Sequence, residues 1–431
     1  MRIHSYNSAV RYLESLIPDP AKKRQGNMRL ERIEHLLRLI GNPEKSFKSI
    51  HIGGTSGKGS TAYITAAILK EAGYNTGLHL SPHLEKINER LQINGKLISD
   101  KEFTNLVAWI KPYVKQVEKE GEYGAPSYFE VLVAMSFEYF KRKKVEIAVI
   151  EVGLGGTLDA TNVIHPLVAI ITNVGLDHTE ILGNTVEKIA REKAGIIKEG
   201  IEVVTAATQK SVLGIIKKCC KEKHARLTII EKRPNVPPLR PIGEHQKVNA
   251  ACAIMAIKKL GFKVSETAIE RALLHVQIPG RFEVIEKLKK PTIVLDGAHN
   301  PAKMRALVDT LRQFFAKRKI TFVFAAKKGK DAEAMLRLLA PLAEKFYFTR
   351  FQATTDFGKN QSMNPEELGK ILKKINRSIQ TETSQNSKKT FYKIVADSKR
   401  NFQLSTFNFQ LICVTGSLYL VGEARKLLNE K

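Results

Sequence analysis

Short runs of apolar and β-branched residues alternate with longer amphipathic stretches along most of this 431-residue chain. From residue 48 onward the short runs lack the strict apolar–polar alternation of strands that have one face in water. Such runs are typical of strands covered by helices on both faces, and therefore of a parallel sheet. The strands expected in the first part of the chain are 49–52, 75–80, 145–152, 166–174 and 202–206.

A second series of expected strands begins near Pro291, after a polar segment, residues 286–291, that we interpret as a linker. The strands expected here are 292–296, 320–326, 345–349, 392–396 and 410–414, and residues 378–390 are expected to form a solvated loop. A chain of this length suits two or three domains. The pattern predicts an α/β protein with two domains, residues 1–288 and 289–431.

The charge and the cysteines indicate what kind of protein this is. Lys and Arg total 70 against 43 Asp and Glu, and the net charge of +27 favours nucleic acid, anionic membranes or ligands rich in phosphate and carboxylate. Four cysteines without CxxC spacing favour reduced thiols. We find neither a signal peptide nor an apolar run of about 18 residues. A basic, soluble, cytoplasmic protein is expected.

A glycine-rich segment, residues 53–61, follows the first expected strand and opens a helix. Closely spaced glycines let backbone amides approach phosphate oxygens, and a helix N-terminus adds partial positive charge. Lys58 would neutralise phosphate charge, and the Ser60 hydroxyl would reach a bound Mg²⁺. The segment departs from the strict P-loop pattern, because Ile52 stands where glycine is expected and Gly59 separates Lys58 from Ser60. The alternative is a flexible strand–helix connection.

Polar groups follow several other expected strands in the same way. Residues 81–83, 153–156 and 177–178 each come directly after a strand. Open α/β sheets bind ligands beyond the carboxyl ends of their strands, so these residues are expected to border one cleft. Taken alone, His178 is more often an ordinary loop residue. Glu130, beside an apolar stripe, is either a helix N-terminal charge or a ligand.

Together these segments resemble the folylpolyglutamate synthase/dihydrofolate synthase family, a branch of the Mur ligase superfamily. The matching segments are 50–61 (IHIGGTSGKGST), 81–99, 127–130 (SYFE), 151–162 (EVGLGGTLDATN), 171–198, 244–250 (EHQKVNA), 279–283 (PGRFE), 296–302 (DGAHNPA) and 414–425. The resemblance implies a P-loop parallel-sheet domain over 1–288 that binds ATP and folate. A smaller Rossmann-like glutamate ligase domain over 289–431 is implied to follow it.

The family implies an ATP-dependent amide ligase that adds L-glutamate to a folate. The acceptor would be tetrahydrofolate, which is polyglutamylated, or dihydropteroate, which becomes dihydrofolate. ATP would convert the acceptor carboxylate into an acyl phosphate, which glutamate attacks with release of phosphate. A free carboxylate is a poor acyl donor, and phosphoryl transfer needs positioning and charge neutralisation above all. A monomer that uses ATP and Mg²⁺, with no nucleic-acid or membrane partner, is expected.

The resemblance also implies roles for single residues. Gly57, Lys58, Gly59 and Ser60 would cradle the triphosphate; Ser81, Glu130 and His178 would hold Mg²⁺; and Asn249, Arg281 and Asp296 would contact ATP, with His299 beside them. Lys58, Lys193 and His178 would be catalytic. Lys193 matches a family lysine that is carbamylated and helps to hold a second metal; the alternative is a helix-face salt bridge with Glu187 or Glu192.

The folate is expected to lie against loop 81–95 and the turn 155–157, helped by residues 27–32. Thr157 stands where the family commonly has Arg, so a cation that would assist the pterin or the carboxylate is absent. Ser56 stands where Asn is commoner, a milder change that keeps a hydrogen-bonding side chain.

Two other functions compete with this hypothesis. A Mur-type ligase would extend a different carboxylic acid, but the segments 81–90 and 159–162 favour the folate branch. A nucleic-acid-binding NTPase would account for the charge. The basic runs 141–144 and 287–290, however, are spread over the chain, and such runs are usually solvated faces.

Overall fold

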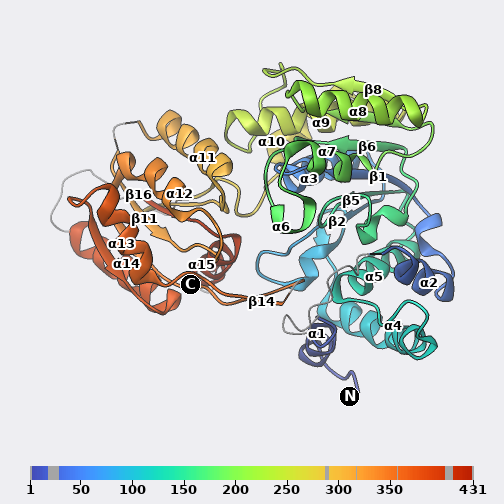
Figure 1. Ribbon diagram of the computed structural model, residues 1–431, viewed down its shortest axis with the longest axis horizontal. Coiled ribbons are helices and arrows are strands. Elements are labelled where there is room, and N and C mark those ends of the chain that lie inside the picture. Colours follow the sequence, from blue (N-terminus) through green and yellow to red (C-terminus); the bar gives the residue numbers. More distant parts are fainter. Residues whose placement is uncertain are drawn as a thin grey trace. The chain divides into compact units, whose positions relative to one another are not determined.

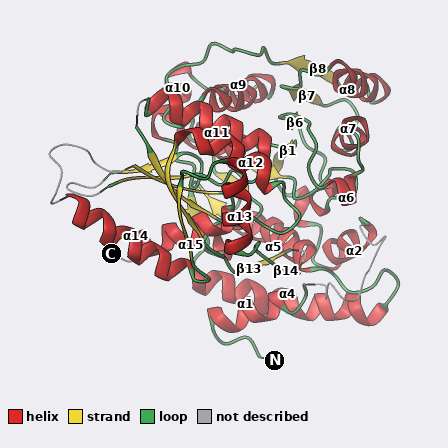
Figure 2. Ribbon diagram, turned by 60° about the vertical axis from the view of Figure 1, so that its left-hand side comes forward, coloured by secondary structure: helices red, strands yellow, loops and turns green. Residues whose placement is uncertain are grey.

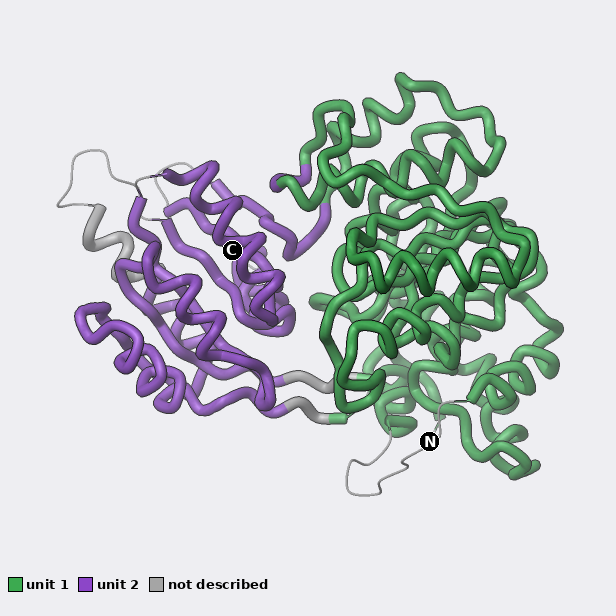
Figure 3. The backbone as a smooth tube through the Cα atoms, turned by 45° about the horizontal axis from the view of Figure 1, so that its top comes forward, with its two compact units in different colours: residues 1–240, 244–277, 356–358 green, residues 241–243, 278–355, 359–431 purple. Residues whose placement is uncertain are grey.

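The computed structural model describes residues 2–17, 29–286, 291–316, 318–356, 358–402 and 411–429, with backbone alone for 353–355, 359–360 and 395–402. The chain forms two compact units (Figure 3). Unit 1 comprises residues 1–240, 244–277 and 356–358, and unit 2 comprises residues 241–243, 278–355 and 359–431. The boundary predicted between residues 288 and 289 lies outside the described residues.

Among the described residues, the sheet of unit 1 has eight strands in the order β4-β3-β2-β5-β1-β6-β7-β8 (Figure 1). Their bounds are β1 Lys48–Gly53, β2 Thr76–His79, β3 Leu91–Ile93, β4 Lys96–Leu97, β5 Ile147–Glu151, β6 Val168–Ile171, β7 Glu202–Thr205 and β8 Arg226–Ile229. Neighbours from β2 to β8 pair in parallel, and β3 and β4 add an antiparallel edge. All five strands predicted for this part of the chain are present.

Helices cover both faces of this sheet, as the strand composition predicts. On β5, Ile147, Ala148, Val149 and Ile150 are all fully buried, although successive residues point to opposite faces. The helices are α1 Tyr6–Glu14, α2 Glu31–Leu39, α3 Lys58–Glu71, α4 Asp100–Glu120, α5 Tyr128–Arg142, α6 Thr179–Leu182, α7 Val186–Ala194, α8 Lys210–Glu222, α9 Glu244–Lys259 and α10 Glu266–His275, with short 3₁₀ turns at Pro43–Lys45, Ile87–Arg90 and Ala160–Val163.

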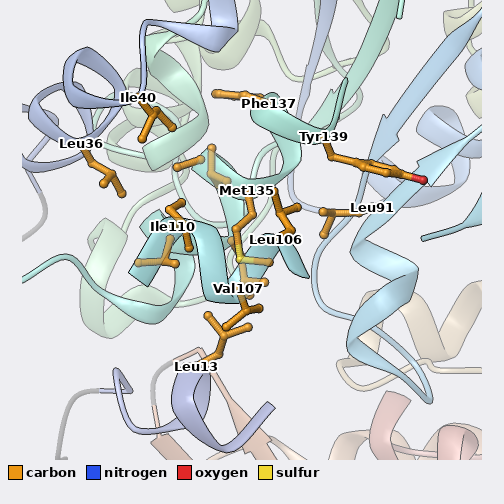
Figure 4. Close-up of a cluster of buried hydrophobic side chains, with 14 of the residues drawn as sticks. Leu13, Leu36, Ile40, Leu91, Leu106, Val107, Ile110, Met135, Phe137 and Tyr139 are labelled. Atoms are coloured by element: carbon orange, nitrogen blue, oxygen red, sulfur yellow. The ribbon is translucent and has the colours of Figure 1, made fainter. Parts of the chain in front are cut away.

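A large apolar cluster lies where α1, α2, α4 and α5 pack together (Figure 4). Leu13 of α1 and Leu36 of α2 are completely buried there, with Ile110 of α4 and Met135 of α5. Burying an aliphatic side chain of this size contributes about 1.5–3 kcal/mol. This packing fixes α5, whose first turn starts near the carboxyl ends of the strands.

The sheet of unit 2 has the order β15-β12-β11-β16-β10-β9, with helices (red) on both sides of its strands (Figure 2). The bounds are β9 Glu283–Ile285, β10 Thr292–Leu295, β11 Ile320–Phe324, β12 Ala343–Phe348, β15 Gln380–Thr383 and β16 Leu411–Thr415, with a small hairpin of β13 Ala353–Thr355 and β14 Gly358–Asn360. The helices are α11 Pro301–Phe314, α12 Ala332–Leu339, α13 Pro365–Ile375, α14 Ser387–Phe402 and α15 Leu418–Asn429, with a 3₁₀ turn at Ala340–Leu342. Among the described strands of the six-stranded sheet, only β9 pairs antiparallel. The two mostly parallel sheets confirm the predicted α/β class.

Two predictions for unit 2 are wrong. Residues 392–396 lie inside α14, and the expected loop 378–390 contains β15 and the start of α14. β15 is an edge strand of its sheet, and β12 is its neighbour among the described strands, so its polar side chains can remain partly in water. Its Glu382 forms an ion pair with Lys345 at 2.6 Å. Tertiary position overrides the local preference in both segments.

Within the described residues, we find no helix long and apolar enough to cross a membrane.

Candidate active site

The predicted site residues of unit 1 follow neighbouring parallel strands. β5 lies between β2 and β1 in the sheet, and β1 also pairs with β6. The carboxyl ends of these four strands lead directly into the segments 53–57, 80–83, 152–156 and 172–178. The structure therefore brings these segments to one edge of the sheet.

The glycine-rich loop has a backbone shape that requires glycine at two positions. Gly54 and Gly57 have φ angles of 138° and 85°. A Cβ on Gly54 would lie 1.9 Å from Thr172 Oγ1, and a Cβ on Gly57 would lie 2.3 Å from Asn249 Oδ1. Gly57 is the N-cap of the 14-residue helix α3. The loop thus turns tightly into a helix N-terminus, as phosphate-binding loops do.

Two lysine side chains meet at this loop. Lys58 Nζ donates to the carbonyl oxygen of Gly54 at 3.2 Å, and Lys193 Nζ of α7 donates to the same oxygen at 2.9 Å. Lys193 is only 4% exposed. Two ammonium groups and a helix N-terminus therefore create positive potential at one point. The bond of Lys193 to Gly54 directs its ammonium to the loop.

Thr172 and Asn173, which follow β6, form hydrogen bonds with the backbone of the glycine-rich loop. Thr172 Oγ1 donates to the Ser56 carbonyl at 2.6 Å, and the Ser56 amide donates to Asn173 Oδ1 at 2.9 Å. The Thr55 amide donates to the Asn173 carbonyl at 2.9 Å. These bonds use the main chain of Ser56, so replacing the commoner Asn with Ser leaves them intact.

A carboxylate that sequence reasoning missed lies beside Ser81. Glu151, the last residue of β5, accepts a hydrogen bond from the Ser81 amide at 3.0 Å. The position of a Cβ on Gly59 would be 3.5 Å from a Glu151 carboxylate oxygen, so this side chain also lies against the first turn of α3. Ser81 Oγ is buried and lacks a hydrogen-bond partner among the described residues. An acidic residue ending a buried strand before a glycine-rich turn was the available signal.

Glu130 is hydrogen-bonded at the start of α5 and to a buried arginine. Its carboxylate accepts the Ser127 amide at 2.6 Å, in a capping box at the start of α5. It also accepts hydrogen bonds from Arg32 Nε at 3.1 Å and Arg32 Nη2 at 3.0 Å, and the side chains of Arg32 and Glu130 are 6% and 5% exposed. These contacts fit the helix-charge alternative, whereas the carboxylate next to Ser81 is that of Glu151.

His178 is the N-cap of α6 with a φ of 50°, and its side chain is 39% exposed. Its Nδ1 lies 3.8 Å from the Glu180 carboxylate. In the part of the chain that the structure describes, no group of three or more His, Cys, Asp or Glu side chains is arranged to hold a metal. The predicted set Ser81, Glu130 and His178 contains a serine, so it falls outside this kind of group and stays a prediction.

Asn249 of α9 lies against the glycine-rich loop at Gly57. The residue is 6% exposed, and its Nδ2 donates to Gln246 Oε1 at 2.9 Å. Gln246 is completely buried, and its Nε2 has no hydrogen-bond partner among the described residues. Gln246 was not singled out from the sequence, although it lies one helical turn before Asn249 in the matching segment 244–250.

The turn after β5 is shaped by the buried carboxylate of Asp159. Asp159 accepts the amides of Leu154 at 2.8 Å and Thr161 at 3.0 Å. Burial raises the pKa of this carboxyl group, and the hydrogen bonds from Thr161 and the backbone oppose the shift. Thr157 donates through its amide and its Oγ1 to the Glu192 carbonyl at 3.0 and 3.1 Å, so its hydroxyl ties the turn to α7.

Unit 2 holds its own cluster at the carboxyl end of β10. Asp296 accepts the amides of Phe282 at 2.9 Å and Ala298 at 2.8 Å. His299 Nδ1 bonds the Gly297 carbonyl at 2.8 Å, and Lys303 Nζ lies 3.0 Å from His299 Nε2.

Arg281 lies close by, because a Cβ on Gly297 would be 2.5 Å from its Nη1. The predicted residues Arg281, Asp296 and His299 thus gather within unit 2. Lys303 is an addition that the sequence did not suggest.

The phosphate-loop sheet followed by a second α/β sheet defines a Mur-ligase-like ATP-dependent ligase. Residues 52–285 match the Mur ligase middle domain, and residues 282–427 match the dihydrofolate synthetase C-terminal domain. The dihydrofolate synthase/folylpolyglutamate synthase of Bacillus subtilis is 36% identical over 429 residues, covering 93% of this chain and 95% of that protein. The chain belongs to the folylpolyglutamate synthase/dihydrofolate synthase family, which confirms the resemblance.

Two solved structures are similar over the whole chain. The Mycobacterium tuberculosis folylpolyglutamate synthase, complexed with ADP and AMPPCP, has a TM-score of 0.87 at 28% identity and covers 99% of each chain. The bifunctional folylpolyglutamate synthase/dihydrofolate synthase of Yersinia pestis, complexed with AMPPNP and a Mn ion, has a TM-score of 0.82 at 26% identity. It covers 99% of this chain and 98% of that one.

Proposed function

We propose that this protein joins L-glutamate to the carboxylate of a folate at the expense of ATP, through an acyl phosphate on the acceptor. The chain belongs to a family of ligases. Relatives that are named for this activity match nearly the whole length of the chain. The observation that carries the proposal is the meeting of Lys58 and Lys193 at Gly54, at the sheet edge where Ser81 and Glu151 also lie.

The phosphate loop would hold the triphosphate. Backbone amides at the start of α3, with Gly57, Gly59 and Ser60, would cradle its oxygens. Lys58 would exchange the Gly54 carbonyl for a phosphate oxygen and offset the charge that develops during transfer. Asn249 in unit 1, and Arg281 and Asp296 in unit 2, are proposed to contact ATP as well. In-line transfer between two anions needs this neutralisation more than covalent help.

The oxygen donors at the strand ends fit a divalent cation. Ser81 Oγ is buried without a described partner, and the Glu151 carboxylate lies beside it, a donor set that suits Mg²⁺. We propose Ser81 and Glu151 as ligands, with His178 from the neighbouring loop, while Glu130 keeps its bond to Arg32. A bound Mg²⁺ would neutralise charge between the phosphate groups.

Lys193 has two proposed forms. As an ammonium it adds positive charge at Gly54, and as a carbamate it would supply an anionic oxygen ligand for a second metal. The acceptor would lie along the loop after β2, residues 80–90, and the turn at 155–157. Glutamate would then attack the activated carboxylate, and phosphate would leave.

The test is an incubation with ATP, Mg²⁺, L-glutamate and either dihydropteroate or tetrahydrofolate. ADP release would be followed, and the products would be identified by mass. We expect ADP release that depends on both the acceptor and glutamate, with a product heavier by one glutamate residue. Absence of ADP release with both acceptors would refute the proposal. A product with one acceptor alone would assign the chain to one of the two activities.

A further inference from the structure

The loop between β2 and β3, residues 80–90, carries Ser81 and is held together from within. The Glu89 carboxylate accepts hydrogen bonds from the three consecutive amides of residues 84–86, at 2.7, 2.8 and 2.9 Å. A carboxylate that satisfies three backbone donors makes the loop a compact body. Movement at the Arg90 end of the loop is therefore transmitted to residues 84–89.

Arg90 ends this loop, and its guanidinium is buried. Its side chain is 1% exposed, and its Cζ lies 5.6 Å from the centre of the Tyr128 ring. Arg90 Nε donates to His83 Nδ1 at 3.1 Å. Burial, with the nearby charge of Arg90, lowers the pKa of His83 to about 3, so the ring is neutral and its Nδ1 accepts this bond.

The other two guanidinium nitrogens of Arg90 bind Asp356. Nη1 donates to Asp356 Oδ2 at 3.1 Å, and Nη2 donates to Asp356 Oδ1 at 2.6 Å. Asp356 follows β13 in the segment 356–358, which belongs to unit 1, and its side chain is 12% exposed. The two residues are 266 positions apart in the sequence, so no local pattern could indicate the pair.

The pair has a physical consequence for the loop. A guanidinium does not lose its proton in proteins, and a buried charge that loses its partner is strongly unfavourable. Without a carboxylate at position 356, Arg90 would lose two charge-assisted hydrogen bonds, and it could replace them by turning toward water. That rotation would break its bond to His83 and shift residues 83–90, whereas the Ser81 amide would stay bound to Glu151.

We propose that Asp356 is a positioning residue that holds loop 80–90 in the geometry that binds the acceptor. This inference rests on the proposed function, which assigns the loop to the folate. Asp356 acts through Arg90 and does not contact the reacting atoms. Its removal should therefore weaken acceptor binding more than ATP binding, because the phosphate loop follows a different strand.

Two variants of one residue test the proposal. Asp356→Asn keeps the size of the side chain and removes its charge, and Asp356→Glu keeps the charge on a longer side chain. The KM values for ATP and for the acceptor that the wild type uses, tetrahydrofolate or dihydropteroate, would be measured with kcat. We expect Asp356→Asn to raise the acceptor KM about tenfold or more, the size of one lost charge-assisted hydrogen bond. The KM for ATP should stay unchanged, and Asp356→Glu should recover part of the loss.

The matched control is Glu333→Gln, which removes a carboxylate from the exposed pair with Arg337 at 2.6 Å. It should change neither KM. Melting temperatures would be measured first and assays run well below them, and acceptor binding without turnover would be measured by titration calorimetry. An unchanged acceptor affinity in folded Asp356→Asn, or an equal loss for ATP, would overturn the inference. A wild type inactive with both acceptors would instead overturn the proposed function.

Discussion

The backbone amide of Ser81 donates a 3.0 Å hydrogen bond to the carboxylate of Glu151, and this bond joins the ends of the neighbouring strands β2 and β5. It places a buried hydroxyl and a carboxylate side by side next to the phosphate loop. The sequence directed attention to Glu130, but that carboxylate is bound to Arg32 and Ser127. We therefore expect substitutions of the two glutamates to have different effects on the Mg²⁺ dependence of activity.

Glu151→Gln should weaken the response to Mg²⁺. The amide keeps the shape of the side chain but loses the charge that favours a divalent cation. We expect the Mg²⁺ concentration for half-maximal activity to rise by about 10- to 100-fold, with turnover falling as well. A Mg²⁺ titration of activity at saturating ATP measures this. An unchanged titration would remove Glu151 from the metal site.

Glu130→Gln is the matched comparison. It leaves the buried Arg32 without its carboxylate, and breaking a buried ion pair costs about 3–5 kcal/mol. The free energy of unfolding, measured with urea, should fall accordingly. The Mg²⁺ titration of the folded variant should stay close to that of the wild type. A large shift in that titration would instead return Glu130 to the metal site.

Lys58→Ala should abolish most of the turnover with the fold intact. The ammonium compensates charge that develops on the transferred phosphoryl group, and removal of one such contact costs about 10²- to 10³-fold in kcat. Lys70→Ala is the control, because Lys70 is exposed in the last turn of the same helix. Steady-state ADP release measures both variants. Near-normal turnover in Lys58→Ala would contradict the phosphate-loop assignment.

The parallel-sheet core could be predicted from the sequence because burial on both faces leaves a direct mark on strand composition. Residues 147–150 are an example, because all four are apolar and fully buried. β15 could not be predicted, because an edge strand keeps polar residues such as Glu382 and leaves no apolar run. Residues 392–396 belong to α14, because a helix can contain the same residue types as a strand.

Prediction of the candidate site from the sequence is limited in the same way. Motif spacing led to the glycine-rich loop and to Ser81, and the structure places them at one sheet edge. Motif spacing led to Glu130 and missed Glu151, although each carboxylate lies beside apolar residues in the sequence. The choice depends on which partner lies opposite in space. Arg32 is 98 positions from Glu130, and Ser81 is 70 positions from Glu151.

The stability of unit 1 should depend on pH through His51 and His79. Both rings are completely buried, and burial lowers the pKa of each to about 3. An unfolded histidine titrates near 6.5, so below that pH the unfolded chain binds protons that the folded chain does not. The stabilisation is complete above about pH 6.5 and is lost as the pH falls, by about 1.4 kcal/mol per pH unit for each histidine.

Urea unfolding between about pH 8 and pH 5 measures this slope. His79→Gln removes one titrating ring and should make the fall in unfolding free energy less steep. His224→Gln is the control, because His224 lies exposed on the surface and should leave the slope unchanged. An identical slope in His79→Gln and the wild type would show that His79 carries no part of the pH dependence.

Lys193 should carry a carbamate when bicarbonate is present. A carbamate forms when a neutral amine adds CO₂ and loses a proton, and it would turn a cation at the phosphate loop into an anionic oxygen ligand. Its remaining N–H would still donate to the Gly54 carbonyl, which Lys193 Nζ now contacts at 2.9 Å. Carbon-13 NMR of the protein in labelled bicarbonate detects the carbamate carbon directly.

Lys198 is the competing site and the control. Burial lowers the pKa of its ammonium, which favours the neutral amine, and its Nζ donates to the Asn162 carbonyl at 2.9 Å. We expect Lys193→Ala to lose the carbamate signal and to lose turnover by about 10²-fold, whereas Lys198→Ala keeps both. A signal lost in Lys198→Ala would move the modification to that lysine. A wild type without any carbamate signal would leave the ammonium of Lys193, bound to Gly54, as its working form.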